Sequence, residues 1–194
     1  MANFIPQKGD LSITRFRKNG AYYGTTLHFA VAPTTQSISS INSLRAFPFI
    51  VTKAQKFDRI AVRVTTTGGA GAVARLGIYA DNGNLYPGAK IVDSGELSMV
   101  GTAPFVMEAT ISVTLKPGLY WLCVITGGAT GTAVAAIAPA NALALEGFDA
   151  TLTGTPNLGY AVAQTYGALP NPYPTSGASG WTLNVPLIAL RKAS

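Results

Sequence analysis

The residues best suited to chemistry in this chain are two aspartates with their neighbours. Asp81 opens the run Asp-Asn-Gly-Asn, and Asp93 follows twelve residues later. Carboxylate and amide oxygens of this kind bind calcium, which takes about six to eight oxygen ligands. The run lacks the later acidic ligand of an EF-hand loop, although Asp93 and Glu96 would complete a site if the chain folded back. Asp-X-Gly and Asn-Gly also form tight turns without a metal, and a turn at residues 81–83 is the interpretation we favour.

Nucleophilic catalysis has few candidate residues here. His28 is the single histidine and Cys123 the single cysteine, and a serine or cysteine nucleophile normally needs a positioned base. No Gly-X-Ser-X-Gly context is present. Cys123 lies in the apolar run LYWLCVIT, which is typical of a small buried residue. A zinc site needs three or four ligands, and no pair of carboxylates suggests glycoside hydrolysis. We therefore expect no enzymatic activity, no metal and no cofactor.

Aromatic and basic residues form two candidate binding sets. Tyrosine and tryptophan rings anchor protein interfaces and also stack on sugar rings. The first set, which we expect to bind a partner protein, comprises Arg15, Arg17, Lys18, Tyr22 and Tyr23. The second set, a candidate glycan site, comprises Tyr160, Tyr166, Tyr173 and Trp181. The tyrosines of both sets lie in loop or turn contexts, where we expect them to be exposed.

The charge of the chain is low and unevenly distributed. Charged residues make up 11% of the sequence, against roughly 25% in an average soluble domain. Weak self-repulsion favours a protein that works inside an assembly. Residues 1–63 hold nine of the fourteen basic residues and two of the eight acidic ones. This basic third suits an acidic protein partner better than nucleic acid, because its charges are dispersed and no nucleic-acid-binding motif accompanies them.

Strand patterns dominate from about residue 47 onward. Alternation places Phe57, Ile60, Val62 and Val64 on the core side of one strand, and the odd-numbered residues of 105–115 on the core side of another. The run 119–126 is nearly all apolar, which predicts burial on both faces. Gly/Pro signals, including Pro87-Gly88, predict turns between strands at about ten-residue spacing, as in a sandwich or barrel.

The C-terminal and N-terminal parts carry weaker patterns. The closing strand over 181–192 is expected to direct five side chains to one side (Trp181, Leu183, Val185, Leu187 and Ala189), with Pro186 placing it at an edge or bulge. Residues 139–148 predict one short helix. Residues 1–46 are expected to form an N-terminal arm or hairpin, with a turn at Asn19-Gly20, and residues 47–194 the sandwich domain.

Membrane insertion and export are not indicated. The longest apolar candidate is interrupted by Pro139 and Asn141 and falls short of the roughly 18 residues that a membrane span needs. The start of the chain lacks a basic region followed by an apolar one. One cysteine excludes an internal disulfide. We therefore expect synthesis in the cytoplasm and no membrane contact.

Turn and strand motifs in residues 47–192 resemble a family of proteins. The runs LGIYADNGNLYPGAKIVDSGEL, LKPGLYWLCVITGG, YGALPNPYP and VPLIALR are similar to a jelly-roll-like sandwich of tailed-phage head-decoration proteins and fibre tips. The resemblance implies an all-β antiparallel fold, location in the virion and no catalytic residues. It favours a capsid decoration (cement) or short head-fibre protein, expected to be a homotrimer docked on the major capsid protein or another virion protein by its basic N-terminal region. The alternative is a receptor-binding tip that recognises cell-surface carbohydrate.

Overall fold

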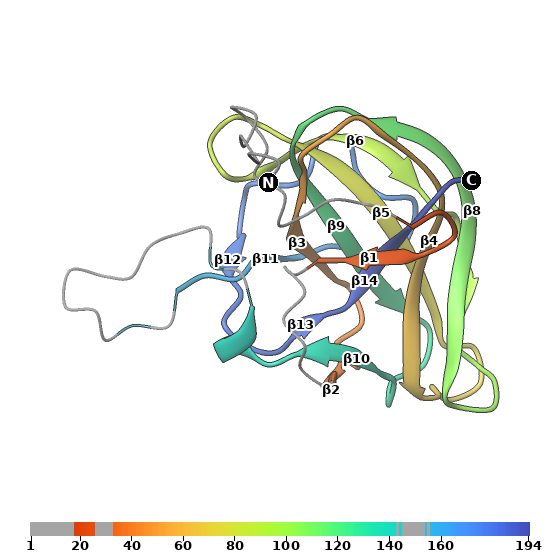
Figure 1. Cartoon of the computed structure of the whole chain (residues 1–194). Helices are drawn as coiled ribbons and strands as arrows, with labels where there is room; N and C mark the ends of the chain where they lie inside the picture. The colour runs from red at the N-terminus through yellow and green to blue at the C-terminus, as the bar shows by residue number, and fades with distance from the viewer. Residues whose placement is uncertain (1–17, 26–32, 143, 145–153, 155) are drawn as a thin grey trace, which may run out of the picture.

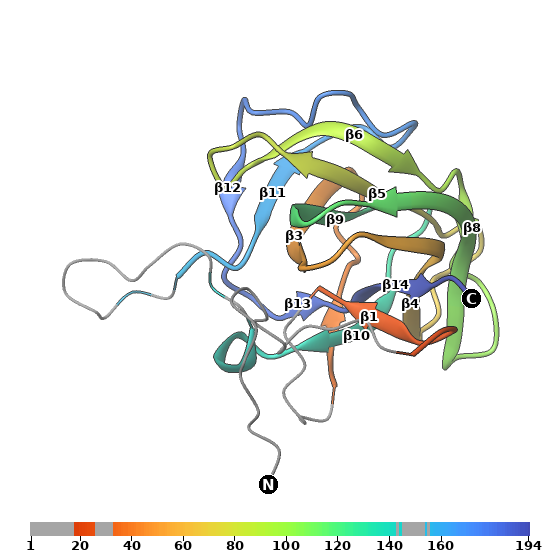
Figure 2. The same ribbon diagram turned by 45° about the horizontal axis from the view of Figure 1, so that its top comes forward.

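Two antiparallel β-sheets packed face to face form the molecule, as expected for an all-β sandwich (Figures 1 and 2). The structure is a computed structural model, and it describes residues 18–25, 33–142, 144, 154 and 156–194. Large apolar side chains from both sheets fill the space between the layers and form the inner core; Phe47, Phe57, Leu76 and Leu122 are fully buried there.

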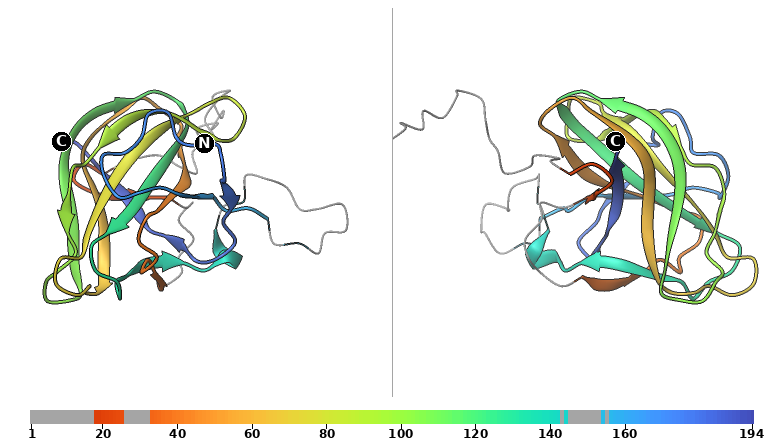
Figure 3. Two further views of the ribbon diagram at one scale, coloured as in Figure 1. Left: turned by 180° about the vertical axis from the view of Figure 1, so that it is seen from behind. Right: turned by 45° about the vertical axis from the view of Figure 1, so that its right-hand side comes forward.

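Sheet A is built around one long strand. Its hydrogen-bonded order is β1 (Tyr22–Gly24), β14 (Ile188–Lys192), β4 (Gln55–Thr66), β10 (Ala133–Ile137) and β13 (Val185–Pro186), with β8 (Phe105–Leu115) paired to β4 and β2 (Thr34–Ser37) paired to β10. Figure 3 (right) shows β1 in red, β14 in dark blue, β4 in gold and β8 in green lying across one side of the molecule. The first and last strands of the described residues, β1 and β14, are therefore neighbours in one sheet.

Sheet B forms the second layer. Its order is β12 (Ser179–Gly180), β11 (Tyr160–Ala163), β3 (Ser43–Val51), β9 (Gly118–Gly127), β5 (Val73–Asp81) and β6 (Pro87–Asp93), with β7 (Leu97–Ser98) paired to β5. Strand β9 occupies the centre, pairing with β3 along Gly118–Val124 and with β5 along Tyr120–Gly127. A central strand of this kind has no solvent-facing edge, which suits the apolar run that forms it.

The alternation expected for two strands is confirmed. In β8, Met107, Ala109, Ile111 and Leu115 are buried, whereas the residues between them are exposed or half-buried. In β4, Phe57, Ile60, Val62 and Val64 are all buried. The step of three residues from Phe57 to Ile60 is accommodated by a bulge in β4, because the adjacent residues Arg191 and Lys192 of β14 pair with Arg59 and Phe57, which are two residues apart. A bulge inserts one extra residue and restores the alternation beyond it.

Burial of β9 on both faces is also confirmed. Leu122 and Val124 belong to the inner core. Trp121, Cys123 and Ile125 face the other way and join a second apolar cluster, the outer core, with Leu44, Ala46, Tyr79, Val162, Leu169 and Tyr173. Sheet B is therefore packed between the inner core and a cover on its outer face, and it is residues 164–178, between β11 and β12, that contribute Leu169 and Tyr173.

The described part of residues 1–46 belongs to the sandwich. Strand β1 pairs with β14, and β2 pairs with β10, while the expected boundary at residue 46 falls inside β3. The expected turn at Asn19-Gly20 is present: the Ala21 N–H donates to the Lys18 carbonyl oxygen at 3.3 Å, and Gly20 has φ of 73°. Residues 1–17 of the expected arm or hairpin lie outside the described residues.

Two local expectations, the turn at Pro87-Gly88 and the helix at 139–148, are corrected. Pro87-Gly88 begins β6 instead of forming a turn; the chain reverses at residues 82–86, where the Asn82 N–H donates to the Tyr86 carbonyl oxygen at 2.9 Å. Proline is tolerated there because β6 is an edge strand and Pro87 is its first residue. The expected helix at 139–148 is a single 3-10 turn, η2 (Pro139–Asn141), in its described part. Most of residues 143–153 lie outside the described residues.

The closing strand changes its inward side at Pro186. Val185 and Pro186 pair with β10 at the end of sheet A, as the edge prediction required. After Leu187, however, Ile188 and Leu190 are fully buried in the inner core, whereas Leu183 is exposed. The single expected face over 181–192 is therefore wrong, because β13 and β14 are two strands with different partners and the alternation restarts between them.

Candidate functional site

Asp81, the first aspartate singled out in the sequence, is a structural residue. Its Oδ2 accepts a hydrogen bond from the Gly83 N–H at 2.8 Å, and its Oδ1 accepts one from Trp121 Nε1 at 2.9 Å. The first contact is an Asx-type turn, and Gly83 adopts φ of 91° in it. The turn prediction for residues 81–83 is therefore confirmed, and the carboxylate also orients a large ring of the outer core.

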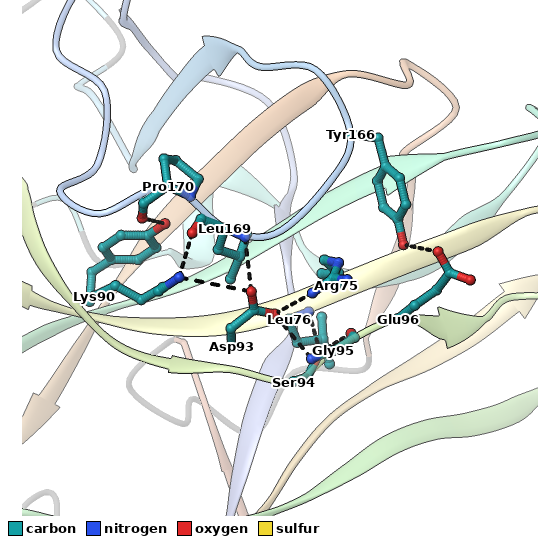
Figure 4. A network of polar contacts seen from close by, with 11 residues as sticks. Arg75, Leu76, Lys90, Asp93, Ser94, Gly95, Glu96, Tyr166, Leu169 and Pro170 are labelled. Carbon is teal, nitrogen blue, oxygen red and sulfur yellow. Dashed lines mark hydrogen bonds and ion pairs between the residues drawn. The ribbon is translucent and has the colours of Figure 1, made fainter.

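Asp93 is the centre of a polar network on the outer side of sheet B (Figure 4). Its Oδ1 accepts hydrogen bonds from Arg75 Nη1 and from the Gly95 N–H, both at 3.0 Å, and its Oδ2 accepts one from the Leu169 N–H at 2.9 Å. Burial alone would raise the Asp93 pKa, but the two backbone N–H groups and Arg75 outweigh it, and the pKa is lowered. The charged carboxylate thus holds residues of β5 and β6 against the distant Leu169.

Residues 164–178, the covering segment, lie across the outer face of sheet B (Figure 2). Tyrosine hydroxyls of the sheet reach its backbone: Tyr79 donates to the Pro170 carbonyl oxygen at 2.8 Å and Tyr86 to that of Pro174 at 2.6 Å. In return, the Tyr173 hydroxyl donates to the Leu44 carbonyl oxygen at 2.9 Å. Rings and hydrogen bonds together close this face with the chain's own residues.

The four candidate glycan residues are dispersed. Tyr173 is 1% exposed, so its expected exposure is wrong, and Trp181 is 9% exposed. Tyr173 packs edge-on against Tyr79 in the outer core, whereas Trp181 packs edge-on against Phe47 in the inner core. Both rings are buried by packing against other aromatic rings, which their Pro/Gly-rich sequence surroundings did not predict.

The other two candidate glycan residues are half-buried. Tyr160 packs against Tyr86, with ring centroids 4.6 Å apart. Tyr166 donates from its hydroxyl to Glu96 Oε2 at 3.3 Å, as Figure 4 shows. Burial, followed by the nearby Glu96 charge, raises the Tyr166 pKa to about 12. The four residues therefore do not form one exposed aromatic platform, and we do not propose carbohydrate recognition from them.

The outer face of sheet A is different, because it carries an apolar hollow. The hollow has a volume of about 210 Å³ and is lined by residues of β1, β4, β8 and β14 and by Leu187, which lies between β13 and β14. The lining residues are Tyr22, Ala61, Val62, Arg63, Val106, Leu187 and Ala189. Val106 is 56% exposed and Tyr22 38% exposed. Exposed apolar surface in a concave setting is typical of a binding site for another molecule. We name this surface the β1–β8 face.

Charged groups line the rim of the β1–β8 face. The Tyr22 hydroxyl donates to Glu108 Oε2, and Arg59 Nε lies 3.6 Å from Glu108 Oε1. Desolvation, followed by the hydrogen bond to Glu108, raises the Tyr22 pKa to about 12. Beyond them, Arg191 makes a two-pronged contact with Asp58, at 2.9 and 3.0 Å. The contact with Glu108 holds Tyr22 in place beside the hollow.

The candidate partner-binding residues are only partly placed. Arg15 and Arg17 lie outside the described residues. Lys18 is exposed, and its backbone N–H donates to the Tyr23 hydroxyl at 2.9 Å. Tyr22 lines the hollow, whereas Tyr23 packs against the inner core. Sequence reasoning missed Arg63, Val106 and Leu187; the one available signal was Val106, an apolar residue on the polar side of the β8 alternation.

Of the two residues considered for nucleophilic catalysis, the structure describes Cys123. Cys123 is fully buried, as predicted, and burial raises the pKa of its thiol, which disfavours the reactive thiolate. His28 lies outside the described residues. Within the described ranges, no three His, Cys, Asp or Glu side chains gather into a metal-binding group. No helix among the described residues is long and apolar enough to cross a membrane.

Comparison with known proteins adds no relative: no family model matches the chain, and no curated protein matches it significantly.

Proposed function

We propose that the protein is a non-enzymatic structural component of a virus particle, a capsid decoration or short head-fibre protein that docks through its β1–β8 face. The resemblance of residues 47–192 to phage head-decoration and fibre proteins supports the virion context. The observation that carries the docking surface is the contrast between the two outer faces of the sandwich. Sheet B is covered by residues 164–178, whereas sheet A leaves an apolar hollow with Val106 exposed.

The partner that suits this face is an acidic protein surface. Arg63 lines the hollow and is exposed, and among the described residues no carboxylate forms an ion pair with it. By contrast, Arg59 and Arg191 are already paired with Glu108 and Asp58. An incoming carboxylate would therefore meet Arg63 while an apolar side chain entered the hollow. Interfaces commonly combine such an apolar centre with a charged rim.

The basic N-terminal region is the second element of the proposal. Lys18, the residue that follows the undescribed residues 1–17, lies one turn before Tyr22, and Tyr22 lines the hollow. Positive charge near the contact would accelerate association with an acidic partner and make it sensitive to salt. The appropriate truncation removes residues 1–17 alone, because removal of residues 1–46 would also delete β1, β2 and part of β3.

The test uses particles assembled without this chain, to which the purified protein is added before sedimentation. We expect the wild type to sediment with the particles, and Val106→Asp to bind about tenfold more weakly or worse, because a charge enters the apolar centre of the contact. Arg63→Glu should weaken binding and reduce its salt dependence. Ser112→Asp, on the exposed side of the same strand, is the matched control and should bind like the wild type.

Three outcomes would count against the proposal in different ways. Absence of the chain from purified native particles would remove the virion function. Unchanged binding of Val106→Asp to the particles would leave the virion function but exclude the β1–β8 face. If Val106→Asp instead turned an oligomer of the purified chain into a monomer in sedimentation equilibrium, this face would be the contact between copies, and the expected homotrimer would be built through it.

A further inference from the structure

Arg45 is a buried cation inside the sandwich. It lies in β3, where its backbone pairs with Ala161 of β11 and Val124 of β9. Its neighbours Leu44 and Ala46 belong to the outer core, so strand alternation directs Arg45 to the inner side with Phe47. The residue is 3% exposed. An arginine at such a position normally has a carboxylate or several carbonyl groups beside it.

In the part of the chain that the structure describes, the Arg45 guanidinium is short of such partners. Its Nε is buried and has no hydrogen-bond partner, and among the described residues no carboxylate forms an ion pair with it. Its Cζ lies 4.9 Å from the ring centroid of Trp181, a cation–π contact. Burial lowers the Arg45 pKa to about 10, so the side chain keeps its charge at neutral pH. One ring face is a weak substitute for a counter-ion.

Trp181 is held so that it covers one face of the guanidinium. Its Nε1–H donates to the Asn184 carbonyl oxygen at 3.1 Å, and its ring packs edge-on against Phe47 with centroids 5.9 Å apart. The Asn184 side chain donates in turn to the Thr35 carbonyl oxygen at 2.9 Å. The ring is thus fixed from both sheets. The indole covers one face of the guanidinium, and the part of an arginine that binds a carboxylate in two-pronged fashion is its N–H edge, to which the unpartnered Nε belongs.

We propose that Arg45 and Trp181 form a binding site for a single carboxylate group. A carboxylate is flat, carries one negative charge and matches the N–H edge of one guanidinium, whereas phosphate would bring a larger and more strongly hydrated charge to a site with one cation. The carboxylate belongs either to a small organic acid or to an acidic side chain of a bound polypeptide. This site lies between the sheets and is separate from the β1–β8 face, so it does not depend on the proposed function.

The experiment compares the thermal unfolding of the wild-type protein in sodium acetate and in sodium chloride at equal ionic strength. Binding to the folded state raises Tm, by about 3–6 °C for a chain of this size once acetate exceeds its Kd tenfold. Arg45→Met should lose the acetate-specific rise, and Arg45→Lys should keep part of it. Arg63→Met, which removes an exposed arginine from the other sheet, is the control and should respond like the wild type.

Two further arms decide the source and the geometry. The blocked tripeptide Ac-Ala-Glu-Ala-NH2 presents a glutamate side chain; tighter binding of the peptide than of acetate indicates a polypeptide ligand, and binding of acetate alone indicates a small acid. Quenching or shift of tryptophan fluorescence on binding should disappear in Trp181→Phe and persist in Trp121→Phe.

Three results would overturn the site. Acetate could raise the Tm of wild type and Arg45→Met equally, which is a general salt effect. A second such result is that neither acetate nor the peptide binds while Arg45→Met is at least as stable as the wild type. Arg45 would then be a packing residue. Finally, acetate could bind only after Glu146→Gln and Asp149→Asn have removed two acidic residues that lie outside the described residues. The carboxylate that Arg45 binds would then belong to the chain itself.

Discussion

Replacement of Asp93 by asparagine is the sharpest test of how the covering segment is held. The substitution keeps the size of the side chain but removes its charge and one of its two accepting oxygens. Asp93 accepts three hydrogen bonds, from Arg75 Nη1, the Gly95 N–H and the Leu169 N–H. The Leu169 contact joins β6 to a segment 76 residues further along the chain. Its loss should therefore release residues 164–178 more than it disturbs the two sheets.

The size of the effect follows from these contacts. A hydrogen bond to a charged group contributes about 1.5–3 kcal/mol, and asparagine retains one accepting oxygen. The Asp93 side chain is 17% exposed and that of Arg75 21% exposed, so water replaces part of what is lost. We expect a decrease of about 2–3 kcal/mol in the free energy of unfolding. For a chain of this size, that corresponds to a Tm lower by roughly 4–12 °C.

Cys123 provides a local readout of the covering segment. It is the single cysteine of the chain, it is fully buried, and it shares the outer core with Leu169 and Tyr173. A thiol reagent such as DTNB can reach it only after residues 164–178 lift or the whole protein unfolds. If the segment opens locally, Asp93→Asn should accelerate labelling of Cys123 by about 30–150-fold, the factor that corresponds to 2–3 kcal/mol.

The matched control is Asp58→Asn, which removes a carboxylate bonded to Arg191 on sheet A. This variant should be less stable than the wild type, but its Cys123 should be labelled no faster than its global unfolding allows. The reasoning would be refuted if Asp93→Asn labelled Cys123 at the wild-type rate, or if both variants accelerated labelling in proportion to their loss in Tm. Either result would mean that the covering segment is held by its apolar contacts and unfolds only with the sheets.

Three further predictions concern pH, packing and the rim of the β1–β8 face. The pKa of Asp93 is lowered in the folded protein, so the stability that its charge contributes is present above about pH 4 and is lost as the pH falls through its folded-state pKa. The Tm of Asp93→Asn should therefore fall less than that of the wild type between pH 5 and about pH 2. Gly77→Ala should lower the free energy of unfolding, measured by chemical denaturation, by about 1–3 kcal/mol, because a Cβ at Gly77 would overlap Leu169 Cδ1 and approach the Val92 carbonyl oxygen. An unchanged denaturation midpoint would contradict this packing. The pKa of Tyr22 is raised to about 12, so its stabilising contribution is complete below about pH 10 and is lost as the pH rises through 12; absorbance at 295 nm should show one tyrosine fewer titrating near pH 12 in Tyr22→Phe than in the wild type.

The strands themselves could be predicted from local pattern. Side chains of a strand alternate between two faces, so the buried residues of β8 followed directly from its sequence. The unbroken apolar run of β9 predicted burial on both faces because a half-exposed strand would show polar residues at every second position. Asp81-Asn82-Gly83 predicted a turn because the hydrogen bond that closes it, from the Gly83 N–H to Asp81 Oδ2, lies within three residues. Each of these inferences depends on neighbours in the sequence, and each is confirmed.

The chemistry of the candidate residues depended on contacts between distant segments. Tyr173 and Tyr160 share one Tyr-rich, Pro/Gly-rich region, yet Tyr173 is fully buried because Tyr79 and Leu44, about 90 and 130 residues away, enclose it. Aspartate is a residue type that is common in turns, but the role of Asp93 in holding residues 164–178 depends on its contact with Leu169. No local pattern encodes which strand lies beneath a loop, because that is decided when the sheets pair.

The boundary between sequence and tertiary structure is clearest at the two outer faces of the sandwich. By itself, the sequence determined an all-β chain with alternating strands, a doubly buried β9 and a low charge. Only the tertiary structure decided that residues 164–178 cover sheet B, that Val106 and Arg63 lie exposed beside Tyr22 on sheet A, and that Arg45 is buried against Trp181. The physical reason is that burial and charge pairing are properties of residues brought together from the whole chain, whereas alternation is a property of the strand alone.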